Sequence, residues 1–171
     1  MANPKTDSAR ALGAAISFVF LMLATPATAQ ESRRNAFDDP FVEVTQGLAG
    51  CPPAEGPLFT EAQIQAEAHD RAQRGTSCWL AGRCRLHNAY LYDKEIIPRV
   101  VKAVKADGGY RDTTVWALGQ RRFVWLKGCV AKPEQRDALE RLVRQIDDVD
   151  GVVNELMVGS TGKPPYKTVT P

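Results

Sequence analysis

The order of hydrophobic patterns between residues 93 and 159 is the feature that most constrains the fold of this 171-residue chain. Apolar residues recur at helical spacing in two segments, and three other segments have the β-branched and aromatic content of strands. In chain order these are a helix over 93–107, strands over 113–118 and 122–130, a helix over 132–149 and a strand over 152–158. This order predicts an α+β fold, an αββαβ two-layer sandwich with two helices on one face of a three-stranded sheet.

Local signals predict where these elements begin and end. Asp93 is expected to cap the first helix, and Gly108 follows its last turn. Pro98 lies just after the first turn, where we expect a slight bend. Gly119-Gln120-Arg121 separates the first two strands and is expected to form the hairpin turn between them.

The alternation within the hairpin strands predicts which residues face the helices. Val124, Leu126 and Val130 share one face of the second strand, whereas Trp125 points to the other face. The best register for the first strand turns Trp116 to the same outer face as Trp125. This outer face would then be apolar, which is unusual for a sheet face in contact with water.

Two arrangements would account for an apolar outer face. In the first, the segment 51–92 folds over this face and Cys129 is joined to it. In the second, Trp116 and Trp125 form an exposed aromatic surface for a lipid, glycan or protein partner. The sequence alone leaves both arrangements open.

The first residues of the chain have the layout of a secretory signal peptide. Lys5 and Arg10 precede an uncharged, mostly apolar run over 11–24, and the small residues Ala27-Thr28-Ala29 follow it. A helix over that run would rise only about 21 Å, which is short of a hydrocarbon core of roughly 30 Å. We therefore expect cleavage after Ala29, export to the periplasm and no transmembrane segment in the mature chain.

An extension separates this leader from the predicted sandwich. Residues 30–57 are punctuated by proline and glycine, with Phe41–Val44 as a short strand or an extended arm. Thr60 begins a capping-box pattern, and the helix that follows is predicted to end at Gly75. The expected organisation is a signal peptide over 1–29, an extension with a short helix and a cysteine loop over 30–92, a domain over 93–159 and a flexible tail over 160–171.

Four cysteines lie after the expected cleavage site. An even number in an exported chain favours two disulfides, for which three connectivities are possible. Cys78 and Cys84 enclose only five residues, so a bridge between them is geometrically easy. This pairing leaves Cys51 with Cys129, whose long loop constrains the unfolded chain more.

The spacing of the cysteines gives less support to two other uses. A zinc site made by His69, Cys78, Cys84 and His87 would lack the C-x2-4-C spacing of common zinc sites. A redox-active thiol would lack the C-x-x-C motif that lowers a thiol pKa. We therefore expect no metal at these residues.

The charge balance and the missing motifs exclude several functions. The chain has 22 Lys and Arg against 20 Asp and Glu, which is too even for a general nucleic-acid binder. It contains no G-x-S-x-G, phosphate-loop or H-E-x-x-H motif, so we expect no enzyme activity and no cofactor. The basic residues that could contact anionic lipid head groups are Arg99, Lys102 and Lys105 on the first predicted helix and Arg121 and Arg122 at the hairpin tip.

Three motifs of the predicted sandwich resemble one known family. The first helix has the pattern D-x-x-I-x-x-x-V-x-x-A-V over 93–104, and the second strand has V-x-L-x-G-x-V over 124–130. The last element has G-V followed by N-x-L-x-V over 151–158. In this order and spacing, residues 93–159 resemble the BON domain, whose αββαβ fold agrees with the pattern above. The turn departs from the family, because Gln120-Arg121 replaces the usual Asp/Asn-Gly.

The resemblance implies binding without catalysis. The matched residues are mostly apolar or glycine, so they specify a fold and nominate no active site. The family is associated with phospholipid and other envelope components, which implies a non-enzymatic periplasmic module that binds an anionic phospholipid surface or another envelope component. The alternatives are a protein-interaction or assembly component of an envelope complex and, with less support, a cysteine-dependent redox or zinc-binding protein.

Overall fold

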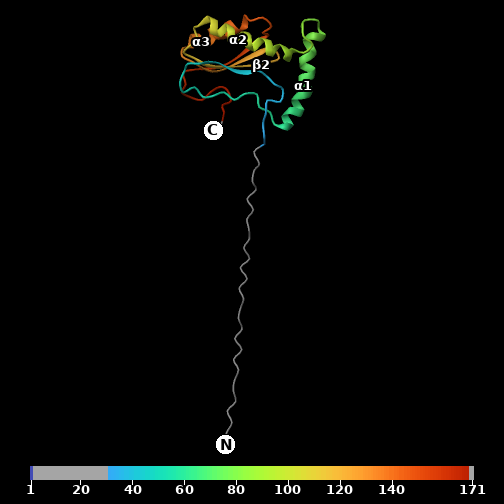
Figure 1. The fold of residues 1–171 in the computed structure, drawn as a ribbon, viewed down its shortest axis with the longest axis vertical. Coiled ribbons are helices and arrows are strands. Elements are labelled where there is room, and N and C mark those ends of the chain that lie inside the picture. Colours follow the sequence, from blue (N-terminus) through green and yellow to red (C-terminus); the bar gives the residue numbers. More distant parts are fainter. Residues whose placement is uncertain (2–30, 170–171) are drawn as a thin grey trace. The chain divides into compact units, whose positions relative to one another are not determined.

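A four-stranded mixed β-sheet is the centre of the structure (Figure 1). The computed structural model describes residues 31–169 together with Met1, and the expected signal peptide lies outside these residues. The strands are β1 (Phe41–Gln46), β2 (Thr114–Gln120), β3 (Phe123–Val130) and β4 (Gly151–Val158). The helices are α1 (Glu61–Leu80), α2 (Asp93–Asp107) and α3 (Pro133–Arg144), with a short 3-10 helix, η1, over Ala89–Tyr92. The predicted α+β fold class is confirmed.

The helices α2 and α3 cover one face of the sheet (Figure 1). The strand order is β1-β2-β3-β4, in which β2 is antiparallel to β1 and β3, and β4 is parallel to β3 across the α3 connection. The core between the helices and the sheet includes Ile96, Val100, Val115, Val124, Leu126, Leu139 and Val143. These side chains are at most 1% exposed, and truncating a large one in such a core costs about 2–5 kcal/mol.

β1 is a fourth strand that the prediction of a three-stranded sheet omitted. It pairs antiparallel with β2, with Phe41 opposite Leu118, and contains a bulge between Glu43 and Thr45. A segment of six residues carries a weak local pattern, and this one forms a strand because the edge of β2 supplies its partners. The segment Phe41–Val44, for which a strand and an extended arm were both considered, is therefore part of a strand.

The hairpin turn lies at Arg121 and Arg122, not over the predicted Gly119-Gln120-Arg121. Both arginines have left-handed backbone angles, with φ of 56° and 67°, as a two-residue turn of type I′ requires. The Asp93 carboxylate stabilises this turn, since Oδ2 accepts from Arg121 N at 2.7 Å and Oδ1 accepts from Arg122 N at 2.8 Å. Asp93 is thus the first residue of α2 and binds the turn, whereas the sequence predicted a helix cap.

The helix α1 begins as predicted but ends later. Gln63 N donates to Thr60 Oγ1 at 3.3 Å, and Thr60 N donates to Gln63 Oε1 at 2.9 Å, which is the predicted capping box. The predicted end at Gly75 is wrong, because α1 continues to Leu80. Gly75 is buried inside the helix, where a Cβ would collide with the side-chain amide of Asn88. This glycine therefore allows close packing and does not terminate the helix.

The ends of α2 and α3 show which local signals were sufficient. Gly108 has a left-handed φ of 74° and ends α2 as predicted, and Pro98 is accommodated inside that helix. The second predicted helix extended to residue 149, but α3 ends at Arg144. Residues 145–150 instead form turns, so apolar spacing alone overestimated the length of this helix.

The outer face of the sheet, opposite α2 and α3, is covered in part by two segments from distant parts of the chain. We call residues 51–59 the arm and residues 166–169 the tail. They pair antiparallel at a bridge between Ala54 and Thr168, and backbone hydrogen bonds of 2.8 and 3.1 Å flank this bridge. The arrangement in which the extension folds over the outer face is therefore the one that forms.

The tail has a defined position in the structure. A flexible segment was expected over 160–171, on the basis of its glycine, proline and polar residues. Tyr166 is nevertheless only 7% exposed and is anchored against the arm. A single buried aromatic residue and the pairing with the arm are sufficient to hold the tail in place.

Candidate functional site

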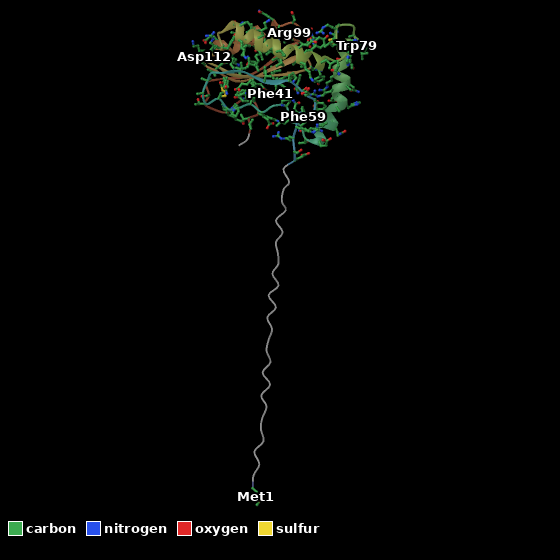
Figure 2. All side chains as sticks on the ribbon, in the orientation of Figure 1. Met1, Phe41, Phe59, Trp79, Arg99 and Asp112 are labelled. Atoms are coloured by element: carbon green, nitrogen blue, oxygen red, sulfur yellow. A yellow bond between two sulfur atoms is a disulfide. The ribbon has the colours of Figure 1, made fainter. Side chains whose placement is uncertain are left out.

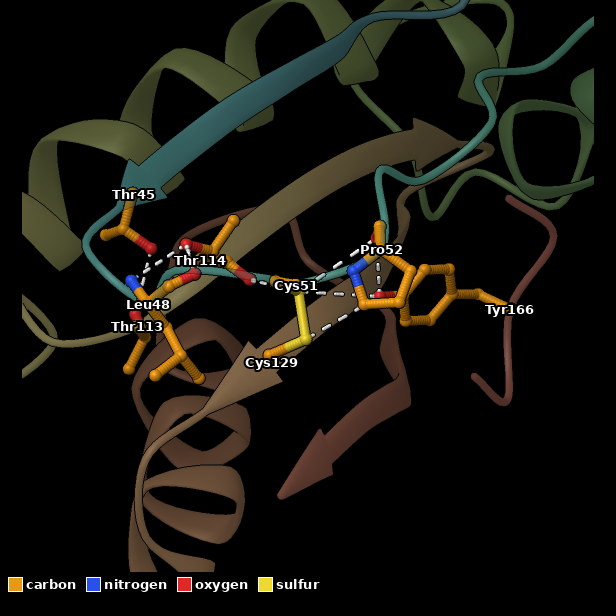
Figure 3. Close-up of a disulfide and its surroundings, with 8 residues drawn as sticks. All are labelled: Thr45, Leu48, Cys51, Pro52, Thr113, Thr114, Cys129 and Tyr166. Atoms are coloured by element: carbon orange, nitrogen blue, oxygen red, sulfur yellow. Dashed lines mark hydrogen bonds between the residues drawn. A yellow bond between two sulfur atoms is a disulfide. The ribbon is translucent and has the colours of Figure 1, made fainter. Parts of the chain in front are cut away.

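The disulfide between Cys51 and Cys129 fastens the arm to the outer face of the sheet (Figure 3). Cys129 is fully buried on β3, and the two Cα atoms are 5.8 Å apart. Tyr166 Oη donates to the carbonyl oxygen of Pro52 at 2.8 Å and lies 3.6 Å from Cys51 Sγ. The predicted pairing of these cysteines is confirmed, and the bridge fixes one side of the candidate site.

The second predicted disulfide, between Cys78 and Cys84, is also present, with Cα atoms 5.4 Å apart. All four cysteines are paired, so none is available as a thiolate ligand or a free thiol. Within residues 31–169, no cluster of His, Cys, Asp and Glu side chains is arranged to hold a metal ion. None of the helices in these residues is both long enough and apolar enough to cross a membrane.

The two predicted outer-face tryptophans have different surroundings. Trp116 and Trp125 are both half-buried on the outer face, as the alternation predicted, and the strand register pairs Trp116 with Lys127 and Leu118 with Trp125. Trp125 lines an open cleft, whereas Trp116 does not. The outer face is therefore covered near Cys129 and accessible near Trp125.

The accessible part of the outer face is the floor of a cleft of about 530 Å³. Its walls come from the arm, from α1, from the hairpin tip and from the tail, and its aromatic residues are Phe59, Tyr90, Phe123 and Trp125. Its basic residues are Arg71, Arg74, Arg121, Lys127 and Lys167, and its acidic residues are Glu55 and Glu67. Such a cleft can hold an anionic group beside an apolar surface.

Arg71 is a structural part of the cleft wall. Its guanidinium donates to both carboxylate oxygens of Asp39, at 2.8 and 2.5 Å, and the residue is only 8% exposed. It lies between the rings of Phe37 and Tyr90, at 4.0 and 4.4 Å from their centroids. A charged group that is paired and stacked in this way stabilises α1 against the strand end, and its charge is largely neutralised.

Lys127 carries a less compensated charge on the cleft floor. Burial lowers its pKa, and Nζ donates only to the carbonyl oxygen of Glu55, at 3.4 Å. The Glu55 carboxylate is bound on both oxygens by Arg33, at 2.8 and 2.9 Å, which lowers the pKa of Glu55. Within residues 31–169, no carboxylate lies within ion-pair distance of Lys127, although Glu155, which lies opposite it on β4, and Glu55 both attract its charge.

A second recess, of about 250 Å³, shares Arg74, Arg121 and Phe123 with the cleft. Its basic residues are Arg74, Arg83, Arg121 and Arg122, and its acidic residue is Asp150. We call the two connected recesses the basic cleft, which is lined by seven basic and three acidic residues. In the part of the chain that the structure describes, Arg83 and Arg121 form no ion pair, so their guanidinium groups are free to donate hydrogen bonds to a phosphate or carboxylate.

Arg122 and Asp93 hold the hairpin tip in place. Arg122 Nε donates to the carbonyl oxygen of Asp148 at 2.8 Å, and its guanidinium lies 5.2 Å from the centroid of the Tyr92 ring. Burial raises the pKa of Asp93 to about 7, although its two backbone hydrogen bonds favour the ionised form. Arg121, which projects from the same turn, is therefore presented to the basic cleft by a well-anchored backbone.

The three basic residues predicted on the first helix lie elsewhere. Arg99 pairs with Glu95 at 2.9 Å and with Asp148 at 3.2 Å. Lys102 and Lys105 are exposed on α2, which covers the face of the sheet opposite the cleft. These three residues therefore do not contribute to the basic cleft.

Of the predicted surface residues, the structure brings together Trp125, Arg121 and Arg122. Five further basic residues line the same cleft and were not predicted, namely Arg71, Arg74, Arg83, Lys127 and Lys167. One signal was present, because residues 71–92 contain four arginines and no acidic residue. Lys127 could not be recognised, since a lysine in a strand pattern gives no indication that a distant arm will enclose it.

Fold and site together define a small α+β protein with a basic, aromatic cleft, fastened by disulfides. Residues 92–160 match the family model described as the BON domain, so this part of the chain is a BON domain, as its motifs indicated. The BON domain is a non-catalytic module that is commonly associated with membrane or phospholipid binding. Comparison of the chain with curated proteins and with solved structures gave no match.

Proposed function

We propose that this protein is a non-enzymatic module that binds anionic phospholipid at a membrane surface through the basic cleft. The observation that carries the proposal is the lining of this cleft, which brings the unpaired guanidinium groups of Arg83 and Arg121 together beside an aromatic floor. The cleft joins the BON domain, through Arg121 and Lys127, to the extension, through Arg74 and Arg83. Both parts of the chain are therefore needed for binding.

Local charge is what makes anionic lipid a suitable ligand. The formal net charge of the chain is only +2, so attraction at long range is weak and is screened within about 8 Å at physiological salt. Arginine binds phosphate with two parallel hydrogen bonds, and Arg83 and Arg121 are free to do so. A basic residue close to an anionic surface contributes about 1 kcal/mol, so a few residues in one cleft are sufficient.

Vesicle co-sedimentation tests this proposal. We expect binding to vesicles of phosphatidylcholine with phosphatidylglycerol and little binding to phosphatidylcholine alone. The double variant Arg83→Gln/Arg121→Gln should bind about 30-fold more weakly, from about 1 kcal/mol for each arginine. The control Lys102→Gln/Lys105→Gln removes the same charge from α2 and should bind like the wild type.

Two outcomes would contradict the proposal. If the wild type fails to bind anionic vesicles at low salt, the lipid function is wrong. If both double variants lose binding equally, the attraction depends on net charge and not on the basic cleft.

We also propose that the chain is exported to the periplasm and cleaved after Ala29, leaving the extension (30–92), the domain (93–159) and a C-terminal segment (160–171). The two disulfides support this, because they suggest an oxidising compartment. Intact-mass and N-terminal analysis of the protein from a periplasmic fraction should give a chain that begins at Gln30. A chain that retains Met1 and carries free thiols would refute the proposal.

A further inference from the structure

The disulfide-closed loop at the end of α1 presents two apolar side chains to solvent. Trp79 is 47% exposed and Leu80 is 72% exposed. Figure 2 shows Trp79 at the end of α1, at the periphery of the structure. Single exposed apolar residues are common, but an adjacent Trp-Leu pair at a projecting loop is a typical interaction site. We call residues 78–84 the tip.

The backbone of the tip is hydrogen-bonded within the tip and α1. Arg83 N donates to Cys78 O at 2.9 Å, and Gly82 N donates to Trp79 O at 2.9 Å. Gly82 has a φ of 66°, which permits this tight return. These bonds pair part of the tip's backbone, which lowers the cost of moving it into a bilayer interface, where unpaired backbone groups are expensive.

Basic residues surround the tip, and acidic residues are absent from its sequence neighbourhood. Residues 71–92 contain four arginines and no aspartate or glutamate. Arg83 is exposed within the tip, and it lines the basic cleft together with Arg74 and Cys78. Arg71, Arg74 and Arg85 form ion pairs, and Arg83 is the arginine of this segment for which the described residues supply none. An apolar pair beside the unpaired Arg83 guanidinium matches the interface of an anionic bilayer, where acyl chains lie directly below phosphates.

We propose that the tip inserts Trp79 and Leu80 into the interface of an anionic bilayer while the basic cleft binds the head groups. This inference rests on the proposed lipid function and adds the element that enters the membrane. The Cys78–Cys84 bridge holds the tip in a single form, which reduces the entropy lost on binding. The tip lies outside the BON domain, so the extension supplies the hydrophobic part of the contact.

The tip variant Trp79→Ser/Leu80→Ser tests this inference on vesicles of phosphatidylcholine with phosphatidylglycerol. We expect at least tenfold weaker binding, without a change in thermal stability, because both side chains are exposed. The matched control is Leu91→Ser, which removes an apolar side chain that is 41% exposed on η1. It should bind within twofold of the wild type.

Insertion has its own optical signature. Lipids brominated near the head group should quench part of the wild-type tryptophan emission on vesicle binding. Trp79→Phe should lose this quenched component and still bind within about threefold, because phenylalanine remains apolar. Retention of the quenched component in Trp79→Phe would place another tryptophan in the bilayer and overturn the inference.

The two proposals fail in different ways. If the tip variant binds like the wild type while Arg83→Gln/Arg121→Gln does not, the inference is wrong and the lipid function remains. If the wild type does not bind at all, both are wrong.

Discussion

The Asp93 carboxylate holds the two arginines of the hairpin tip in left-handed conformations that a side chain normally disfavours. Such turns usually contain glycine, which adopts these angles without strain. Here the two hydrogen bonds of the carboxylate, of 2.7 and 2.8 Å, offset the cost of having side chains at these positions. Desolvation of this carboxylate raises its pKa to about 7, from 3.8. The native state therefore retains a proton over a pH range in which the unfolded chain has released it.

This difference gives folding stability a defined dependence on pH. Because the pKa of Asp93 is higher in the native state than in the unfolded chain, its contribution to the free energy of unfolding is fully present below pH 3.8. That contribution is lost as pH rises through about 7. Between these values, Asp93 makes the free energy of unfolding fall with pH, by at most about 1.4 kcal/mol per pH unit.

The substitution Asp93→Asn should flatten this slope, since asparagine does not titrate. Urea unfolding at pH 5, 6, 7 and 8 measures the effect. The exposed residue Asp137 provides a control, and Asp137→Asn should retain the wild-type slope. An unchanged slope in Asp93→Asn would show that another group is responsible.

Among the elements, the arm and the tip depend on different disulfides. Cys51 and Cys129 are separated by 78 positions in the sequence, and Cys78 and Cys84 by 6. The loop-entropy model gives about 4.5 kcal/mol for the first and about 2 kcal/mol for the second. The long bridge therefore contributes mainly to stability, and the short bridge mainly to the shape of the tip.

Removing each bridge should separate these roles. Cys51→Ala/Cys129→Ala should lower the free energy of unfolding by about 2–4 kcal/mol, as is typical of native disulfides. Cys78→Ala/Cys84→Ala should cost about 2 kcal/mol or less and should weaken vesicle binding, because the tip is no longer held in one form. Chemical denaturation and co-sedimentation of both variants check this, and equal losses of stability would contradict it.

For the whole molecule, the sequence predicted what depends on local pattern. The helices α2 and α3, the strands β2 to β4 and the Thr60 cap follow from periodicity and capping signals within each segment. The Cys78–Cys84 disulfide followed from its short loop, and Cys51–Cys129 was the pair that remained. The face assignment of Trp116 and Trp125 followed from strand alternation.

What the sequence did not predict depends on contacts between distant segments. β1 needs the edge of β2, the turn at Arg121 needs the Asp93 carboxylate, and Gly75 needs the neighbouring Asn88. The basic cleft is the largest omission, because its walls come from the arm, α1, the hairpin and the tail. Its basic residues are scattered along the chain and become a site only after the extension folds onto the sheet.

The bridge between Cys51 and Cys129 also implies an order of maturation. In a chain that is still reduced, the arm that carries Glu55 and Phe59 to the cleft is not yet fastened to β3. We therefore expect a newly made chain to have little affinity for lipid until it is oxidised. Under the proposed function, such timing would keep the protein from the inner surface of the membrane it leaves and activate it on the other side.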